Sequence, residues 1–199
     1  MKQNTEQLWD QRLRIDTSGS DALGADIYHY PYEPTPYAVL ERLAEQGEFC
    51  SGQTLVDYGC GKGRAGFFLN RKTACSVIGV EYNPRIWQQA QKNWKTNGCN
   101  PDITFLCEDA ARFFPETADC FYFFNPFSIE ILKTVLGQIK TAYYTAPRSM
   151  RLYFYYPNDL YVSHLMSADG LLFRKEIDCR DLFPNRDVRE RILVFDLEL

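Results

Sequence analysis

The stretch that most constrains this chain is residues 54–66, where a short apolar run leads into an acid and a glycine-rich turn. Leu55 and Val56 are typical of the end of a buried strand, and Asp57 stands at the carboxyl tip of that strand. Three glycines alternate through the turn that follows, at Gly59, Gly61 and Gly63. Glycine gives the backbone access to positive φ and lets a ligand come closer than any Cβ would allow. Because the next helix presents free N–H groups, the stretch predicts a site for a nucleotide-like ligand.

Two ligand classes use such a turn, and the acid before it distinguishes them. Residues 61–66 spell G-x-G-x-x-G, the dinucleotide fingerprint in which backbone amides contact a pyrophosphate. Residues 56–63, V-D-Y-G-C-G-K-G, resemble instead the first motif of the Rossmann-like (class I) S-adenosylmethionine-dependent methyltransferases, in particular small bacterial members with mostly unassigned substrates. A carboxylate at Asp57 would repel a pyrophosphate but suits the ammonium end of S-adenosylmethionine. A strand, a glycine-rich turn and a helix can also be a mere connection.

The resemblance implies a fold, a domain organisation and a cofactor. The fold is α/β, a doubly wound, mostly parallel seven-stranded sheet with an antiparallel last strand. We expect one globular methyltransferase core at residues 50–199, preceded by an N-terminal helical lid and bracing segment at residues 1–49. The cofactor is S-adenosylmethionine. The residues that match the first motif, and are therefore expected to bind it, are Asp57, Gly59, Cys60, Gly61 and Gly63.

A second acid, Glu81, follows the next expected strand. The apolar run at residues 75–80 has no clean alternation, which is typical of a strand covered on both faces. Glu81 stands eighteen residues beyond Gly63, close to where an acid binds ribose hydroxyls in dinucleotide folds. A carboxylate there can accept both hydroxyl hydrogens. Glu81 and the adjacent Tyr82 are therefore candidate cofactor-binding residues.

The third expected strand, residues 103–107, ends in Glu108-Asp109-Ala110. The resemblance places an adenine-binding acid here, and we choose Asp109 over Glu108, with Ala110 beside it. Asp109 could equally cap a short helix. The series of acids at successive strand tips favours ligand binding, because a ligand lies across the carboxyl edges of an open α/β sheet.

The fourth expected strand, residues 119–124, ends in Asn125-Pro126-Phe127. This resembles the Asn/Asp-Pro-Pro-aromatic loop of amino-group methyltransferases, where a side-chain amide oxygen and a backbone carbonyl accept hydrogens from the target nitrogen. The resemblance makes Asn125 and Pro126 the candidate catalytic residues, and Asn125 also a cofactor-pocket residue. The chain departs from the pattern because a single proline is followed directly by Phe127. A plain strand-to-helix turn is the other explanation.

Patterns outside the motifs predict helix starts and an aromatic segment. Thr35-Pro36 and Asn83-Pro84 each read as an N-cap followed by proline at the first helical position, and Gly98 closes the second helix. An aromatic segment precedes the core, with Tyr28, Tyr30, Tyr32 and Tyr37. These tyrosines could stack on an adenine, shelter a sulfonium by cation–π attraction, or pack on the outside of the sheet.

Composition limits the partners and the other kinds of site. The 199 residues contain 22 Lys and Arg against 26 Asp and Glu, and this net charge of −4 disfavours a nucleic-acid partner. The seven cysteines form no C-x-x-C pair and read as reduced core thiols, so with two histidines we expect no metal site. A signal-peptide core and an apolar run of about 18 residues are both missing, which predicts a cytoplasmic protein without a membrane span.

The expected function is S-adenosylmethionine-dependent methyl transfer to an unidentified acceptor, such as a nitrogen of a small molecule or a protein. An enzyme of this kind supplies mainly proximity and alignment, so the chain needs no Ser/His/Asp constellation. Two alternatives stay open. A protein could hold the cofactor without catalysis, or a nicotinamide-dependent oxidoreductase could use the glycines at 61–66 for NAD.

Overall fold

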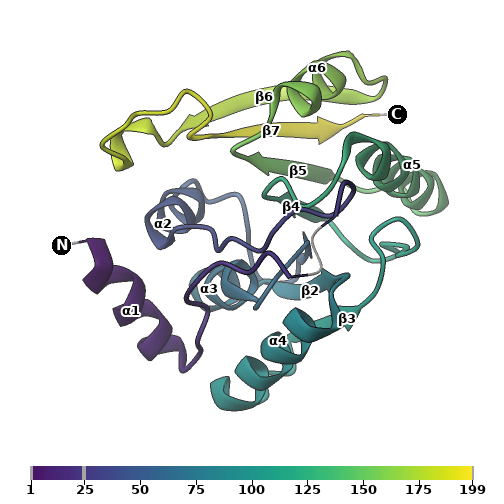
Figure 1. Ribbon diagram of the computed structural model, residues 1–199. Coiled ribbons are helices and arrows are strands. Elements are labelled where there is room, and N and C mark those ends of the chain that lie inside the picture. Colours follow the sequence, from purple (N-terminus) through teal and green to yellow (C-terminus); the bar gives the residue numbers. More distant parts are fainter. Residues whose placement is uncertain (1, 24–25, 199) are drawn as a thin grey trace.

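A computed structural model describes residues 2–23 and 26–198 and shows two helices followed by a series in which strands and helices mostly alternate (Figure 1). The strands are β1 (Thr54–Tyr58), β2 (Ser76–Glu81), β3 (Ile103–Cys107), β4 (Cys120–Phe123), β5 (Met150–Tyr155), β6 (Leu171–Asp178) and β7 (Arg191–Leu197). The α-helices are α1 (Lys2–Leu13), α2 (Tyr37–Glu45), α3 (Arg64–Thr73), α4 (Pro84–Asn97), α5 (Ile129–Thr145) and α6 (Asp159–Ser167). A single 3-10 turn, η1 (Arg180–Leu182), lies between β6 and β7.

These strands form one seven-stranded sheet in the order β3-β2-β1-β4-β5-β7-β6. Strand β1 pairs in parallel with β2 and β4, β2 pairs in parallel with β3, and β4 with β5. Strand β7 runs antiparallel between β5 and β6. The predicted fold class is therefore confirmed. The strand order reverses between β1 and β4, and ligands of open α/β sheets bind at the carboxyl ends of the strands at such a switch point.

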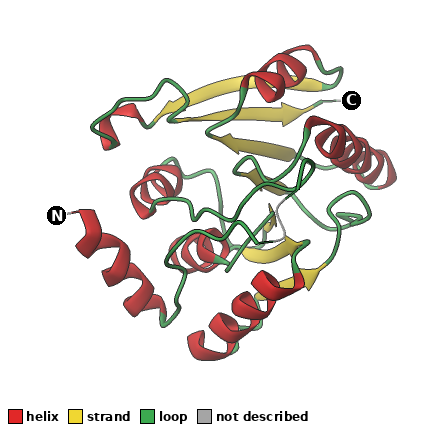
Figure 2. Cartoon of the chain, in the orientation of Figure 1, coloured by secondary structure: helices red, strands yellow, loops and turns green. Residues whose placement is uncertain are grey.

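Helices cover both faces of the sheet, so most strand residues are buried whichever way they point (Figure 2). Strand β4 shows this clearly, because all four of its residues are buried. Cys120 and Tyr122 pack into the cluster that contains α2 and α3 residues, whereas Phe121 and Phe123 pack into the cluster that contains α5 and α6 residues. Two-sided burial explains the near-continuous apolar runs in the sequence.

One of the two expected helix caps is confirmed and the other is wrong. The Asn83 side chain accepts a hydrogen bond at the start of α4, and Gly98 ends that helix in the left-handed conformation at φ +109°. At the start of α2 the N-cap residue is Pro36, with no side-chain hydrogen bond. Thr35 instead has its hydroxyl 3.0 Å from the hydroxyl of Tyr122, because both side chains are buried and each needs a partner.

The cysteines are only partly the core thiols that the sequence suggested. Four are buried, Cys60, Cys75, Cys120 and Cys179. Three are exposed, Cys50, Cys99 and Cys107, and for these the prediction is wrong. Within residues 2–23 and 26–198, no group of three or more His, Cys, Asp or Glu side chains could hold a metal ion. None of the helices in that part of the chain is long and apolar enough to cross a membrane.

Candidate functional site

The glycine-rich turn after β1 brings two distant segments against the backbone. Gly59, Gly61 and Gly63 have φ of +70°, +56° and +91°. A Cβ at Gly59 would lie 2.3 Å from the Cβ of Pro126, and a Cβ at Gly61 would lie 2.3 Å from the ring of Tyr32. Both glycines are therefore required by conformation and by close approach. The two segments in contact are the loop after β4 and the chain that precedes α2.

Asp57 lies at the carboxyl tip of β1 and is 4% exposed. Its Oδ2 is buried and has no hydrogen-bond partner in the described part of the chain. Burial and, to a smaller extent, the charge of Glu81 raise the pKa of Asp57 to about 7, while the Gly66 backbone N–H acts in the opposite direction. A buried carboxylate oxygen without a donor is costly, so its retention beside a cavity indicates a missing ligand donor.

Glu81, at the tip of β2, connects the glycine turn to the start of α4. Its Oε2 accepts the backbone N–H of Gly61 at 2.9 Å, and its Oε1 accepts the N–H of Asn83 at 2.8 Å. Burial raises the pKa of Glu81, and these two N–H groups lower it again. Each oxygen keeps a free lone pair that can accept a hydroxyl hydrogen from a ligand.

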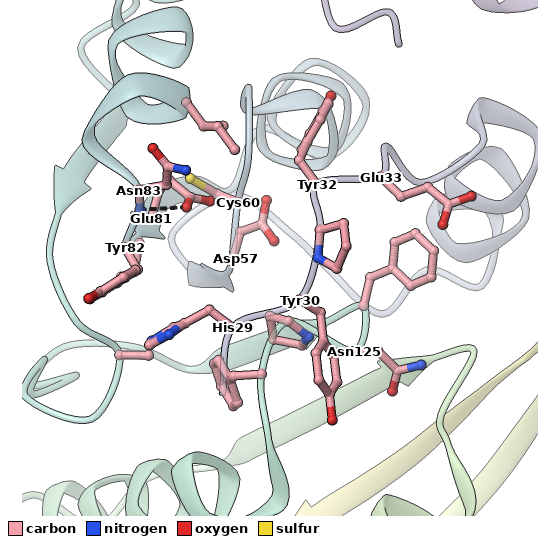
Figure 3. A pocket seen from close by; sticks show the side chains of 18 of the residues that line it. His29, Tyr30, Tyr32, Glu33, Asp57, Cys60, Glu81, Tyr82, Asn83 and Asn125 are labelled. Carbon is pink, nitrogen blue, oxygen red and sulfur yellow. Dashed lines mark hydrogen bonds between the residues drawn. The ribbon is translucent and has the colours of Figure 1, made fainter. Parts of the chain in front are cut away.

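One cavity collects these side chains at the carboxyl edge of the sheet (Figure 3). The expected residues that line it are Asp57, Gly59, Cys60, Glu81, Tyr82, Ala110, Asn125 and Pro126. Gly61 and Gly63 shape the turn behind the lining without belonging to it. Burial raises the pKa of the Cys60 thiol well above its ordinary value, which favours the neutral thiol over the thiolate that a nucleophile needs.

The third acid is arranged differently from the first two. Asp109 Oδ1 accepts the backbone N–H of Ala111 at 2.9 Å, as a cap does. Glu108 and Ala110 line the cavity, whereas Asp109 does not. Residues 110–112 form a turn and not the short helix that Asp109 was expected to cap, and its assignment to an adenine stays a prediction.

Asn125 and Pro126 lie at the tip of β4 with their polar groups already engaged. Asn125 has φ +39°, a left-handed conformation that asparagine tolerates better than most residues. Its side-chain amide donates to the Tyr156 carbonyl, and its Oδ1 accepts the N–H of Asn158 at 3.3 Å. The Pro126 carbonyl accepts the N–H of Tyr30 at 3.2 Å. In this conformation, both groups proposed to receive a substrate nitrogen have partners within the protein.

The chain before α2 forms part of the site, and two of the four candidate tyrosines line the cavity. Ser128 donates its N–H to the Tyr28 carbonyl at 2.7 Å, so residues 28–30 lie antiparallel to residues 126–128. Tyr30 and Tyr32 line the cavity, and Figure 3 shows both beside it. Tyr37 is buried in the core instead. Four further residues that were not predicted also line the cavity: His29, Glu33, Thr35 and Tyr122. Among them only His29 had a sequence signal, an acid three residues before it that could orient its ring.

Side chains within the glycine motif hold this N-terminal segment in place. Lys62 donates to the Ser18 carbonyl at 2.6 Å. Arg64, 5% exposed, donates from Nε to the Thr17 hydroxyl at 2.7 Å and pairs with Glu6. Lys62 and Arg64, which stand between the glycines of the motif, thus connect the turn to α1 and to the loop after it.

Comparisons with known proteins point to one enzyme class. The family described as "Methyltransferase domain" matches residues 55–142. Methyltransferase GfsG of Streptomyces halstedii is 27% identical over 99 residues, 45% of this chain and 36% of that protein. A protein-lysine N-methyltransferase of Saccharolobus islandicus is 36% identical over 76 residues, 36% of this chain and 45% of that protein. The matched region thus spans less than half the length of these relatives.

Solved structures share the fold over most of the chain. A TehB-like SAM-dependent methyltransferase from Corynebacterium glutamicum superposes with a TM-score of 0.56 at 18% identity, covering 100% of this chain and 98% of that one. The Pyrococcus abyssi tRNA (uracil-54, C5)-methyltransferase, solved with S-adenosyl-L-homocysteine, has a TM-score of 0.58 at 17% identity and covers 83% of this chain and 39% of that one. At these identities, the likeness shows a common fold.

Proposed function

We propose that this chain, a Rossmann-like (class I) S-adenosylmethionine-dependent methyltransferase by its fold and its matched domain, binds S-adenosylmethionine and transfers the methyl group to an acceptor. The observation that carries the proposal is the buried oxygen of Asp57, which has no partner among the described residues and lies beside the glycine turn and the second acid, Glu81. An ammonium group supplies the donor that Asp57 lacks, and ribose hydroxyls suit the free lone pairs of Glu81.

Two acids of the cavity suit two parts of this cofactor, Asp57 the ammonium group and Glu81 the ribose hydroxyls. The proposed cofactor-binding residues are Asp57, Gly59, Cys60, Gly61, Gly63, Glu81, Tyr82, Asp109, Ala110 and Asn125. The bound cofactor supplies a methyl group already activated on a sulfonium. The chain contributes alignment of the acceptor and exclusion of water. Alignment of two reactants alone can give a large rate effect. We also propose that residues 1–49 brace the site through Lys62 and Arg64 and close over it.

The proposed acceptor is a small molecule or a protein side chain. The net charge of −4 argues against nucleic acid, although the P. abyssi neighbour is named for a tRNA substrate. A nitrogen acceptor at Asn125 and Pro126 would share the Pro126 carbonyl with the Tyr30 N–H, which uses one of its two lone pairs. Screening amines, hydroxyl compounds and small proteins for release of S-adenosylhomocysteine tests the proposal. Cofactor binding with no turnover on any of these would favour a non-catalytic cofactor-binding protein.

The affinity for S-adenosylhomocysteine is expected to fall as the pH falls below 7. The pKa of Asp57 is raised to about 7, so the free protein loses the charged carboxylate below that pH, whereas a bound ammonium needs it charged. Each unit of pH below 7 should lower the affinity by up to about tenfold. Calorimetric titrations between pH 5.5 and 7 measure this dependence. Asp57→Asn should bind weakly at every pH in that range, and a flat wild-type profile would contradict the assignment.

If Asn125 acts mainly in aligning the acceptor, replacing it is expected to lower kcat while leaving cofactor affinity almost unchanged, because the residue holds the tip of β4 where the acceptor would lie. Asn125→Ala and Asn125→Gly both remove the amide that binds Tyr156. Only alanine is also strained at the φ of +39°, by about 1 to 2 kcal/mol. The alanine variant should therefore melt lower than the glycine variant, while both lose turnover. Loss of cofactor binding with turnover at saturation intact would place Asn125 in the cofactor pocket alone.

A further inference from the structure

His29 has one ring nitrogen fixed and the other without a partner. Its Nδ1 lies 3.1 and 3.3 Å from the two carboxylate oxygens of Asp26. Its Nε2 is buried and has no hydrogen-bond partner among residues 2–23 and 26–198. The imidazole stacks on Tyr82 with ring centroids 3.8 Å apart and an interplanar angle of 7°. Figure 3 shows the side chain at the cavity, close to Tyr82.

The Asp26 carboxylate decides which nitrogen of His29 carries hydrogen. Asp26 Oδ1 accepts the backbone N–H groups of Tyr28 and His29, both at 2.7 Å, and these bonds hold the pKa of Asp26 below its ordinary value. An ionised carboxylate only accepts, so Nδ1 must donate. In the neutral ring, Nε2 is then an acceptor, and it belongs to a residue that lines the cavity.

The position of the ring identifies the half of the cofactor that it faces. Tyr82 directly follows Glu81, and a charged His29 would lower the pKa of Glu81, so the imidazole lies near the acid proposed to hold the ribose. The backbone of His29 is itself fixed by an antiparallel bridge to Phe127. A purely structural histidine would have both nitrogens satisfied, whereas this one keeps a buried acceptor open beside the proposed adenosine site.

We propose that His29 is a cofactor-binding residue whose Nε2 accepts a hydrogen bond from a ribose hydroxyl of S-adenosylmethionine, with Asp26 as the positioning residue. The inference rests on the proposed function. Each oxygen of Glu81 already accepts one backbone N–H group. A ribose hydroxyl that points away from Glu81 would need another acceptor, and His29 Nε2 supplies it. Through this contact, the segment before α2 covers the adenosine and not only the acceptor.

The test separates the ring nitrogen from the ring itself. His29→Phe keeps a flat aromatic ring that can stack on Tyr82 but has no nitrogen, and it should bind S-adenosylhomocysteine about tenfold more weakly, the loss of one hydrogen bond. Asp26→Asn keeps an oxygen for the two backbone N–H groups and removes the negative charge that faces Nδ1. Its affinity for S-adenosylhomocysteine should therefore fall less than that of His29→Phe. Tyr28→Phe, exposed in the same segment and outside the cavity lining, is the control and should bind normally. Thermal melting establishes that each variant is folded.

Truncated ligands locate the contact. The loss in His29→Phe should persist with 5′-methylthioadenosine, which lacks the amino-acid portion, whereas a loss caused by Asp57→Asn should nearly vanish with that ligand. A deoxyribose analogue lacking the contacted hydroxyl should bind equally to wild type and to His29→Phe. Wild-type affinity, or tighter binding, in folded His29→Phe would overturn the inference alone. Failure of the wild-type protein to bind any of these ligands would overturn the proposed function together with it.

Discussion

Gly61→Val is expected to abolish binding of S-adenosylhomocysteine while leaving a protein that melts cooperatively. A Cβ at this position would lie 2.3 Å from the Tyr32 ring, which the hydrogen bond from its hydroxyl to the Thr17 carbonyl holds in place. A β-branched residue is also disfavoured at the φ of +56°. The backbone N–H of Gly61 would then move away from Glu81, and both the turn and the ribose acid would be misplaced together. Calorimetric titration measures the loss.

Gly52→Val is the matched control for this change. Gly52 also has a positive φ, +89°, but nothing lies within 4 Å of a Cβ built there. The control should therefore share the backbone strain, about 1 to 2 kcal/mol, without losing affinity for the cofactor. If Gly61→Val bound S-adenosylhomocysteine as well as Gly52→Val does, the turn would be a connection and not a ligand site.

Glu81→Ala is expected to weaken cofactor binding by about 1.5 to 3 kcal/mol, the range for hydrogen bonds to a charged acceptor. The structure adds a second cause. Alanine also frees the backbone N–H groups of Gly61 and Asn83, both of which Glu81 now accepts. Titrations with S-adenosylhomocysteine at fixed pH and salt measure the change.

Glu81→Gln should be milder, because its single carbonyl oxygen can keep one of the two backbone hydrogen bonds. A ligand without ribose hydroxyls should bind wild type and Glu81→Gln with similar affinity if the acid holds the ribose. Equal affinities for S-adenosylhomocysteine in wild type and both variants would place the ribose elsewhere.

The local signals at the strand tips were enough to predict the fold and the part of the cavity lining that lies at the carboxyl edge of the sheet. Asp57 and Glu81 follow apolar runs whose two-sided burial is visible in the sequence, and a parallel sheet brings such tips to one edge. The position of an acid along the chain does not show whether its carboxylate oxygens already accept hydrogen bonds within the protein. Asp109 carries the same tip signal as Glu81, and each accepts the backbone N–H two residues further on, yet only Glu81 lines the cavity.

A role for the N-terminal segment was predicted, but its pairing with the loop after β4 could not be, because that pairing is long-range. Tyr30 contacts Pro126 across nearly a hundred positions through backbone groups that carry no side-chain signal. The same pairing occupies the Pro126 carbonyl, and Asn158 and Tyr156 occupy the Asn125 amide. Thr35 failed as a cap for a similar reason, since its hydroxyl meets a distant tyrosine. Local propensity is outweighed wherever a buried polar group finds a tertiary partner.

The most direct test of the account is a calorimetric titration of the wild-type protein with S-adenosylmethionine, S-adenosylhomocysteine and NAD at one pH. A buried, unpartnered Asp57 oxygen beside the glycine turn favours an ammonium and repels a pyrophosphate. The two sulfur-containing ligands should therefore bind at a single site and compete with each other, while NAD produces no binding heat. Binding of NAD with no response to either of the other two would contradict the account.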